Sequence, residues 1–146
     1  MLTTVSVPPE LLRALLAAAR AELPREWIAA LGGRVHAGRV RLERFEPLRT
    51  VAASAHHFVV DPVAFVQQEH ALRRAGSSWL GFVHSHPHGG LAPSLADREA
   101  SWRDCLQCIL SPRGGGALAA FVHRGSAYEP LPVVVAGDNL TAGDAA

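Results

Sequence analysis

Two histidines and an aspartate lie close together in one stretch of the chain, in a pattern that could bind a metal ion. The stretch begins with His84-Ser85-His86-Pro87 and reaches Asp97 ten residues later. The apolar run before it is typical of a buried strand. Because side chains two positions apart on a strand share a face and lie about 6.6 Å apart along it, the imidazoles of His84 and His86 can converge on one ion. Ser85 must point to the opposite face.

The residues after the histidines predict a turn and then a helix that brings the aspartate back to the strand. Pro87 cannot donate a ladder hydrogen bond, so it ends the strand. Gly89-Gly90 then permits a reversal, and a helix is expected from Ser94 to about Asp104, with Asp97 in its first turn. Two imidazoles and one carboxylate leave one position of a tetrahedral zinc ion open for water, as in catalytic zinc sites.

Each half of this pattern also has a simpler explanation. The sequence Ser94-x-x-Asp97 is close to a capping box, which usually marks only the start of a helix. A His-x-His pair alone is weak evidence of a metal site. The combination of both on one apolar strand favours the metal site. The two roles are compatible, because Ser94 can cap the helix while Asp97 binds the ion.

The combined pattern of H-S-H-P, six residues, then S-x-x-D resembles the signature of the JAMM family (JAB/MPN+ domains). Members of this family are zinc metallopeptidases that act on ubiquitin and ubiquitin-like proteins. The resemblance implies one Zn²⁺ ion per chain, with His84, His86 and Asp97 as its ligands. It also implies that the Ser94 hydroxyl donates a hydrogen bond to the oxyanion that develops during hydrolysis.

The general acid/base of the family is a glutamate near the end of the first helix, where the chain enters a strand. The matching stretch here is residues 24–33, which gives that role to Glu26; Glu22 is close enough to be a rival. Glu26 would take a proton from the attacking water and pass it to the departing amine. Ser85 and His88 are weaker candidates for supporting the ligands or touching the substrate, and His88 also fits an ordinary solvated loop residue.

The resemblance further implies the kind of partner. We expect a ubiquitin-like β-grasp protein or a sulfur-carrier protein, cleaved at the amide bond after its C-terminal Gly-Gly; a peptide bond and an isopeptide bond both remain open. A catalytically silent scaffold would lack metal ligands, which are present here. RadC-type relatives associated with DNA usually show H-N-H-P where this chain has Ser85. A zinc deaminase on a related fold would need H-x-E and P-C-x-x-C, which this chain does not supply.

Composition narrows the class of protein. The length of 146 residues predicts one domain, and a net charge of +1 from 14 basic and 13 acidic residues gives no general reason to expect nucleic acid or an acidic membrane as a partner. No apolar stretch approaches the ~20 residues that cross a bilayer, and arginines interrupt the N-terminal Leu/Ala run, so we expect no export signal. Two cysteines, Cys105 and Cys108, do not make a disulfide framework, so a cytoplasmic location is expected. Because they are three positions apart on a predicted strand, they face opposite sides and are interpreted as small core residues. The oligomeric state stays open.

The pattern of apolar residues and turn signals predicts an alternation of strands and helices. Strands are expected at about 3–7, 26–31 (closing on Gly32-Gly33), around Val40 and Leu42, 51–60, 79–86, 105–110, 117–122 and 128–135, and helices at about 10–23, 62–75 and 94–104. The resemblance makes residues 1–136 one JAMM/MPN+ domain, and 137–146 are expected to be a disordered tail. The implied fold is α/β, a three-layer α/β/α sandwich with a curved mixed sheet of the cytidine-deaminase-like (JAB/MPN) kind, with one long helix on one side and two on the other.

Overall fold

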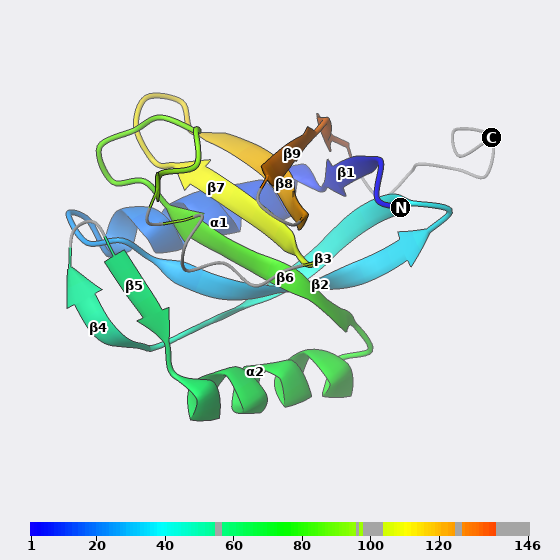
Figure 1. The fold of residues 1–146 in the computed structure, drawn as a ribbon, viewed down its shortest axis with the longest axis horizontal. Coiled ribbons are helices and arrows are strands. Elements are labelled where there is room, and N and C mark those ends of the chain that lie inside the picture. The colour runs from blue at the N-terminus through cyan, green and yellow to red at the C-terminus, as the bar shows by residue number, and fades with distance from the viewer. Residues whose placement is uncertain (55–56, 96, 98–103, 125–126, 137–146) are drawn as a thin grey trace.

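Short strands and two helices make up most of the chain that the structure, a computed structural model, describes: residues 1–54, 57–95, 97, 104–124 and 127–136 (Figure 1). The helices are α1 (Pro9–Ala21) and α2 (Pro62–Arg74). The strands are β1 (Thr4–Val7), β2 (Ile28–His36), β3 (Arg39–Pro47), β4 (Thr50–Ser54), β5 (His57–Val60), β6 (Ser78–Ser85), β7 (Leu106–Ser111), β8 (Ala117–Arg124), β9 (Ala127–Leu131) and β10 (Val133–Val135).

One mixed sheet with the strand order β10-β1-β3-β2-β6-β7-β8-β9 forms the centre of the molecule. β2 runs antiparallel to both of its neighbours, whereas β6 and β7 are parallel. β9 and β10 stand at opposite edges of the sheet, yet only Pro132 separates them along the chain. The sheet therefore curls until its two edges approach each other. The expected last strand at 128–135 is in fact two strands, because the chain passes from one edge to the other at this proline.

The two helices cover opposite faces of the sheet (Figure 1). Alternate side chains of a strand point to opposite faces, and β2 shows this directly. Ala29 and Leu31 lie in the apolar core that includes α1, whereas Ile28 and Ala30 lie in the core that includes α2. Residues 28–31 of this strand are all apolar because both faces of the sheet are covered there. The α/β fold with a curved mixed sheet is confirmed.

The ends of both helices follow from their sequence. Pro9 occupies the first turn of α1, where a missing N–H costs nothing, and this helix has an apolar stripe whose Leu15, Leu16 and Ala19 are buried. The Asp61 carboxylate accepts a hydrogen bond of 3.0 Å from the Val63 N–H and caps α2, which begins at Pro62 as predicted. Within the described residues, no helix is long and apolar enough to span a bilayer.

Three sequence-based boundaries differ from the structure or lie outside it. β2 does not close at Gly32-Gly33 but continues to His36, because a Cβ atom on Gly33 would lie 2.0 Å from the Arg41 carbonyl oxygen, so glycine lets β3 approach there. The segment 51–60 forms two strands, β4 and β5, which pair in a separate small sheet. Of the helix expected from 94 to 104, Leu95 and Asp97 are helical and most of the rest lies outside the described residues, as does the tail from 137.

Candidate metal centre

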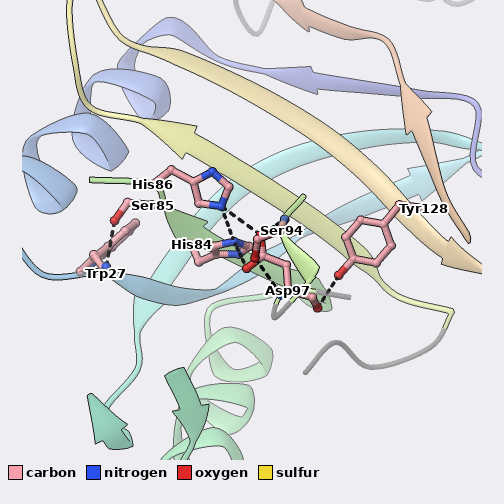
Figure 2. Close-up of polar contacts among 7 residues, drawn as sticks. All are labelled: Trp27, His84, Ser85, His86, Ser94, Asp97 and Tyr128. Carbon is pink, nitrogen blue, oxygen red and sulfur yellow. Dashed lines mark hydrogen bonds and ion pairs between the residues drawn. The ribbon is translucent and has the colours of Figure 1, made fainter. Parts of the chain in front are cut away.

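The end of β6 supplies both histidines from the middle of the sheet. His84 pairs with Ile28 of β2 on one side and with Ile109 of β7 on the other. His86 follows the strand, but its N–H still donates to the Leu110 carbonyl oxygen at 2.9 Å, so the extended conformation continues through it. The two imidazoles therefore share one face, while Ser85 points away from them toward Trp27 (Figure 2). This is the arrangement that the His-x-His spacing predicts.

A reciprocal pair of hydrogen bonds fixes the aspartate. The Asp97 N–H donates to the Ser94 hydroxyl oxygen at 3.0 Å, and the Ser94 N–H donates to the Asp97 Oδ2 atom at 2.8 Å. This is a capping box in which an aspartate takes the usual place of glutamate. The second oxygen of the carboxylate, Oδ1, faces the His84 ring, and Asp97 is only 5% exposed. The cap and the candidate ligand are thus the same side chain.

The candidate ligand atoms have the spacing that a small metal ion requires. The Nε2 atom of His84 lies 3.1 Å from the Oδ1 atom of Asp97, the Nε2 atom of His86 lies 3.0 Å from its Oδ2 atom, and the two Nε2 atoms are 3.3 Å apart (Figure 2). Two ligand atoms that each lie 2.0–2.1 Å from a tetrahedral ion are about 3.3 Å apart. His84, His86 and Asp97 therefore place their donor atoms close enough together to share one metal ion.

The charges at this point also suit a metal ligand set. Burial by itself raises the pKa of Asp97, but hydrogen bonds from His84 and His86 outweigh it and hold the pKa of this carboxyl well below its usual range. The hydrogen bond to Asp97 raises the pKa of His86, against the opposing effect of burial. The carboxylate is thus ionised at neutral pH, the state in which it binds metals.

Glu26 lies beside this cluster because the pairing between β2 and β6 already begins before the first residue of β2. The Ser85 N–H donates to the Trp27 carbonyl oxygen and the Trp27 N–H donates to the Ser85 hydroxyl oxygen, both at 2.8 Å. One step further in this antiparallel register, Glu26 comes opposite His86. The acid and the second imidazole therefore lie just beyond the adjacent ends of two neighbouring strands.

The environment of Glu26 suits a general base. Burial first, and the negative charge of Asp97 second, raise its pKa to about 7, while positive charge on His86 opposes the change. Its Oε2 atom is buried and has no hydrogen-bond partner among the described residues. A carboxylate with such a pKa can accept a proton near neutral pH and release it again.

The other candidates from the sequence lie outside this cluster. Glu22 is the C-cap of α1, and its side chain is 44% exposed and paired with Arg25 at 3.3 Å. His88 is exposed in the turn after the histidines. Ser85 is fully buried, and its hydroxyl oxygen contacts the Trp27 N–H.

The two cysteines are core residues on opposite faces, as their spacing predicts. Cys108 lies in the core that includes α1, and Cys105 lies in the core that includes α2. Burial raises the pKa of Cys105 to about 11 and that of Cys108 to about 12. Both thiols therefore stay protonated at neutral pH and are poor ligands and poor nucleophiles.

One contact of the site could not be predicted from the motif. The hydroxyl of Tyr128, on β9, donates a hydrogen bond of 3.0 Å to the backbone carbonyl oxygen of Asp97. Figure 2 shows this tyrosine approaching Asp97 from the side away from His86. Its only signal in the sequence is that the chain contains no other tyrosine.

Known proteins resemble the chain along most of its length. Residues 8–136 match the family model described as prokaryotic homologs of the JAB domain. A probable TtuB-protein conjugate cleaving protease of Thermus thermophilus is 38% identical over 112 residues, which cover 70% of this chain and 75% of the relative. A desampylase of Haloferax volcanii is 36% identical over 91 residues, which cover 61% of this chain and 64% of the relative.

Solved structures show the same fold. A protein from Desulfitobacterium hafniense superimposes with a TM-score of 0.84 at 25% identity, over 92% of this chain and 94% of the other. A protein from Salinibacter ruber gives a TM-score of 0.67 at 20% identity, over 92% and 93% of the two chains. The chain is an α/β protein with a candidate metal site at the centre of its sheet. It belongs to the prokaryotic JAB-domain family, which confirms the resemblance to JAMM proteins.

Proposed function

We propose that the protein is a zinc metallopeptidase that hydrolyses the amide bond after the C-terminal Gly-Gly of ubiquitin-like or sulfur-carrier proteins. The observation that carries this proposal is the convergence of His84, His86 and Asp97 next to Glu26. Membership of the JAB-domain family supports it. So do the two relatives, of which one is named as a protease that cleaves TtuB–protein conjugates and the other as a desampylase.

The chain's own residues would divide the reaction among them. His84, His86 and Asp97 would hold Zn²⁺, which when bound supplies a Lewis acid that polarises the scissile carbonyl and makes water more acidic. Glu26 accepts a proton from the attacking water and gives it to the departing amine, so the amine leaves as a neutral product and Glu26 returns to its starting state. Its buried Oε2 atom, to which no described residue donates a hydrogen bond, is the atom suited to this transfer.

Ser94 would stabilise the charge that develops on the carbonyl oxygen. Its oxygen already accepts a hydrogen bond from the Asp97 N–H, but its own proton is not used by that contact. The hydroxyl can therefore donate to the oxyanion, a contact that is typically worth about 3 kcal/mol in the transition state. The capping bond holds the hydroxyl beside the ligand carboxylate while it does so.

The proposal is tested by incubating the zinc-loaded protein with Gly-Gly-ended carrier proteins. One set of carriers bears a linear C-terminal extension and a second set is joined through an isopeptide bond to a lysine side chain, which separates the two kinds of amide. Mass spectrometry should show cleavage after the second glycine. A chelator should abolish the cleavage and added zinc should restore it. Binding without cleavage in both sets would favour a scaffold instead.

Three variants connect the activity to the site. His86→Ala should lose stoichiometric zinc and all cleavage, whereas Glu26→Gln should keep zinc and lose cleavage. His70→Ala is the matched control, because His70 is an exposed histidine of α2 and should keep both properties. Full activity of Glu26→Gln would reject the assignment of the base, and wild-type zinc affinity of His86→Ala would reject it as a ligand.

A further inference from the structure

Tyr128 connects the C-terminal part of the sheet to the candidate metal ligand Asp97. It lies on β9, directly opposite His123 of β8 in their antiparallel register. Its hydroxyl donates to the Asp97 carbonyl oxygen at 3.0 Å across a separation of 31 residues (Figure 2). Such a contact depends on the tertiary fold, because nothing in the local chain brings the two residues together.

Neighbouring rings on β8 fix the direction of the tyrosine ring. The ring of His123 packs edge-on against it with centroids 5.1 Å apart, and the ring of Phe121 lies 5.9 Å away at a tilt of 30°. Phe121 and His123 are two residues apart on one strand, so they share a face and flank Tyr128. His123 is itself only 7% exposed. The packing of the Tyr128 ring therefore fixes the direction in which its hydroxyl points.

The hydrogen bonds of Asp97 hold each of its parts separately. The imidazoles of His84 and His86 and the Ser94 N–H contact its carboxylate, and the Ser94 hydroxyl oxygen accepts from its N–H. Tyr128 holds its carbonyl. The N–H and the carbonyl of Asp97 are thus both hydrogen-bonded. Because these two bonds restrain the backbone of Asp97, they also restrain the orientation of its side chain.

The same place on β8 and β9 also holds the end of the segment that carries Asp97. Asp104, the next described residue after Asp97, donates its N–H to the His123 carbonyl oxygen at 3.0 Å. His123 and Tyr128 thus contact the segment twice, once at the candidate ligand and once at Asp104. The β8–β9 pair therefore holds Asp97, the residue that supplies the carboxylate of the site, in place against the sheet.

We propose that Tyr128 is a positioning residue for the metal centre, acting through the Asp97 carbonyl to present the carboxylate to the two imidazoles. This inference rests on the metal site of the proposed function but not on its substrate. Hydrogen bonds that orient metal ligands typically change metal affinity by 10–100-fold when they are removed. Because Tyr128 holds the backbone of the ligand and not its carboxylate, we expect the lower end, a loss of about 10-fold.

The test measures the affinity of the full chain for Zn²⁺ alone, by competition with a chromogenic chelator. Tyr128→Phe keeps the ring and its packing and removes only the hydroxyl. The control is Leu131→Ala, which trims a partly buried core side chain of the same strand without touching the hydroxyl. Tyr128→Phe should bind zinc about 10-fold more weakly, while Leu131→Ala should bind like the wild type. With Co²⁺ in place of zinc, the visible absorption spectrum should change in Tyr128→Phe and not in Leu131→Ala.

The outcomes separate this inference from the proposed function. Wild-type affinity and spectrum in Tyr128→Phe would overturn the positioning role while leaving the metal site intact. An equal loss of affinity in both variants would overturn it too, because the effect would then come from a weakened β9. A wild-type protein that binds no divalent ion would reject the metal site and with it the proposed function.

Discussion

The Ser85 hydroxyl oxygen accepts a 2.8 Å hydrogen bond from the Trp27 N–H, and the Ser85 N–H donates to the Trp27 carbonyl oxygen at the same distance. Trp27 precedes the first residue of β2, so these two bonds extend the pairing with β6 beyond the strand. Trp27 is the peptide neighbour of Glu26, and Ser85 lies between the two histidines. The contact therefore sets the separation between the candidate base and the candidate metal ligands.

Removing this hydroxyl should affect catalysis more than metal binding. In Ser85→Ala the Trp27 N–H is left buried without its acceptor, which costs about 1–3 kcal/mol in the free energy of unfolding. We expect stoichiometric zinc but a reduced kcat, because the backbone that carries Glu26 is less firmly held. Urea denaturation, metal analysis and the cleavage assay measure the three quantities. Ser78→Ala, an exposed serine at the other end of β6, is the control; a Ser85→Ala variant with wild-type kcat and stability would contradict the prediction.

Glu26 should make the stability of the metal-free protein depend on pH. Its pKa is raised from 4.5 to about 7, so the folded state binds the proton more tightly than the unfolded state does. The free energy of unfolding is therefore unaffected by this group below pH 4.5, falls as the pH rises toward 7, and stays lowered above 7. Glu26→Gln should be more stable than the wild type above pH 7, with a difference that shrinks as the pH falls toward 4.5.

Urea denaturation in the presence of a chelator, repeated across this pH range, measures that difference. Glu22→Gln is the matched control, because Glu22 is half-exposed and paired with Arg25, and its removal should give no gain above pH 7. Zinc should reduce the gain in Glu26→Gln, since a nearby cation stabilises the ionised carboxylate. A gain that is the same at pH 4.5 and pH 8 would show that it does not come from titration of Glu26.

The site could be predicted from the sequence as far as its geometry is local. His84 and His86 share a face because a strand has a period of two, and Asp97 returns to Ser94 because a capping box spans three residues. Glu26 came from the resemblance to a family, since its place opposite His86 depends on a pairing between strands. Tyr128 could not be predicted at all, because only the curling of the sheet brings β9 to the segment that carries Asp97.

The fold, like the site, could be predicted where the pattern is local and not where it depends on contacts between distant strands. The apolar stripe of α1 and the Asp61 cap of α2 are local patterns, and both helices begin where the sequence indicates. The predicted end of β2 at Gly32 was wrong, because glycine also marks a close approach of two backbones, and that reason appears only once β3 is in place. Pro132 divides the last strand because it lies where the two sheet edges meet.

The cysteines should be inert in the folded protein. Burial raises the pKa of Cys105 to about 11 and that of Cys108 to about 12, so very little thiolate exists at pH 8. Iodoacetamide should therefore modify neither residue under native conditions and both in urea, as measured by mass spectrometry of the intact chain. The zinc content and the activity should survive the native treatment. Fast native modification of Cys105, with loss of zinc, would show instead that this thiol takes part in the site.

Ser94 has two roles that two substitutions can separate. As the cap it stabilises the start of a helix, and replacing such a residue costs about 1 kcal/mol with alanine but only a few tenths with glycine. As an oxyanion donor it should be worth about 10²–10³ in kcat. We therefore expect Ser94→Gly to unfold like the wild type and to keep zinc, yet to lose kcat as strongly as Ser94→Ala does. If Ser94→Gly keeps its activity while Ser94→Ala loses it, the hydroxyl serves the helix alone and another donor must face the oxyanion.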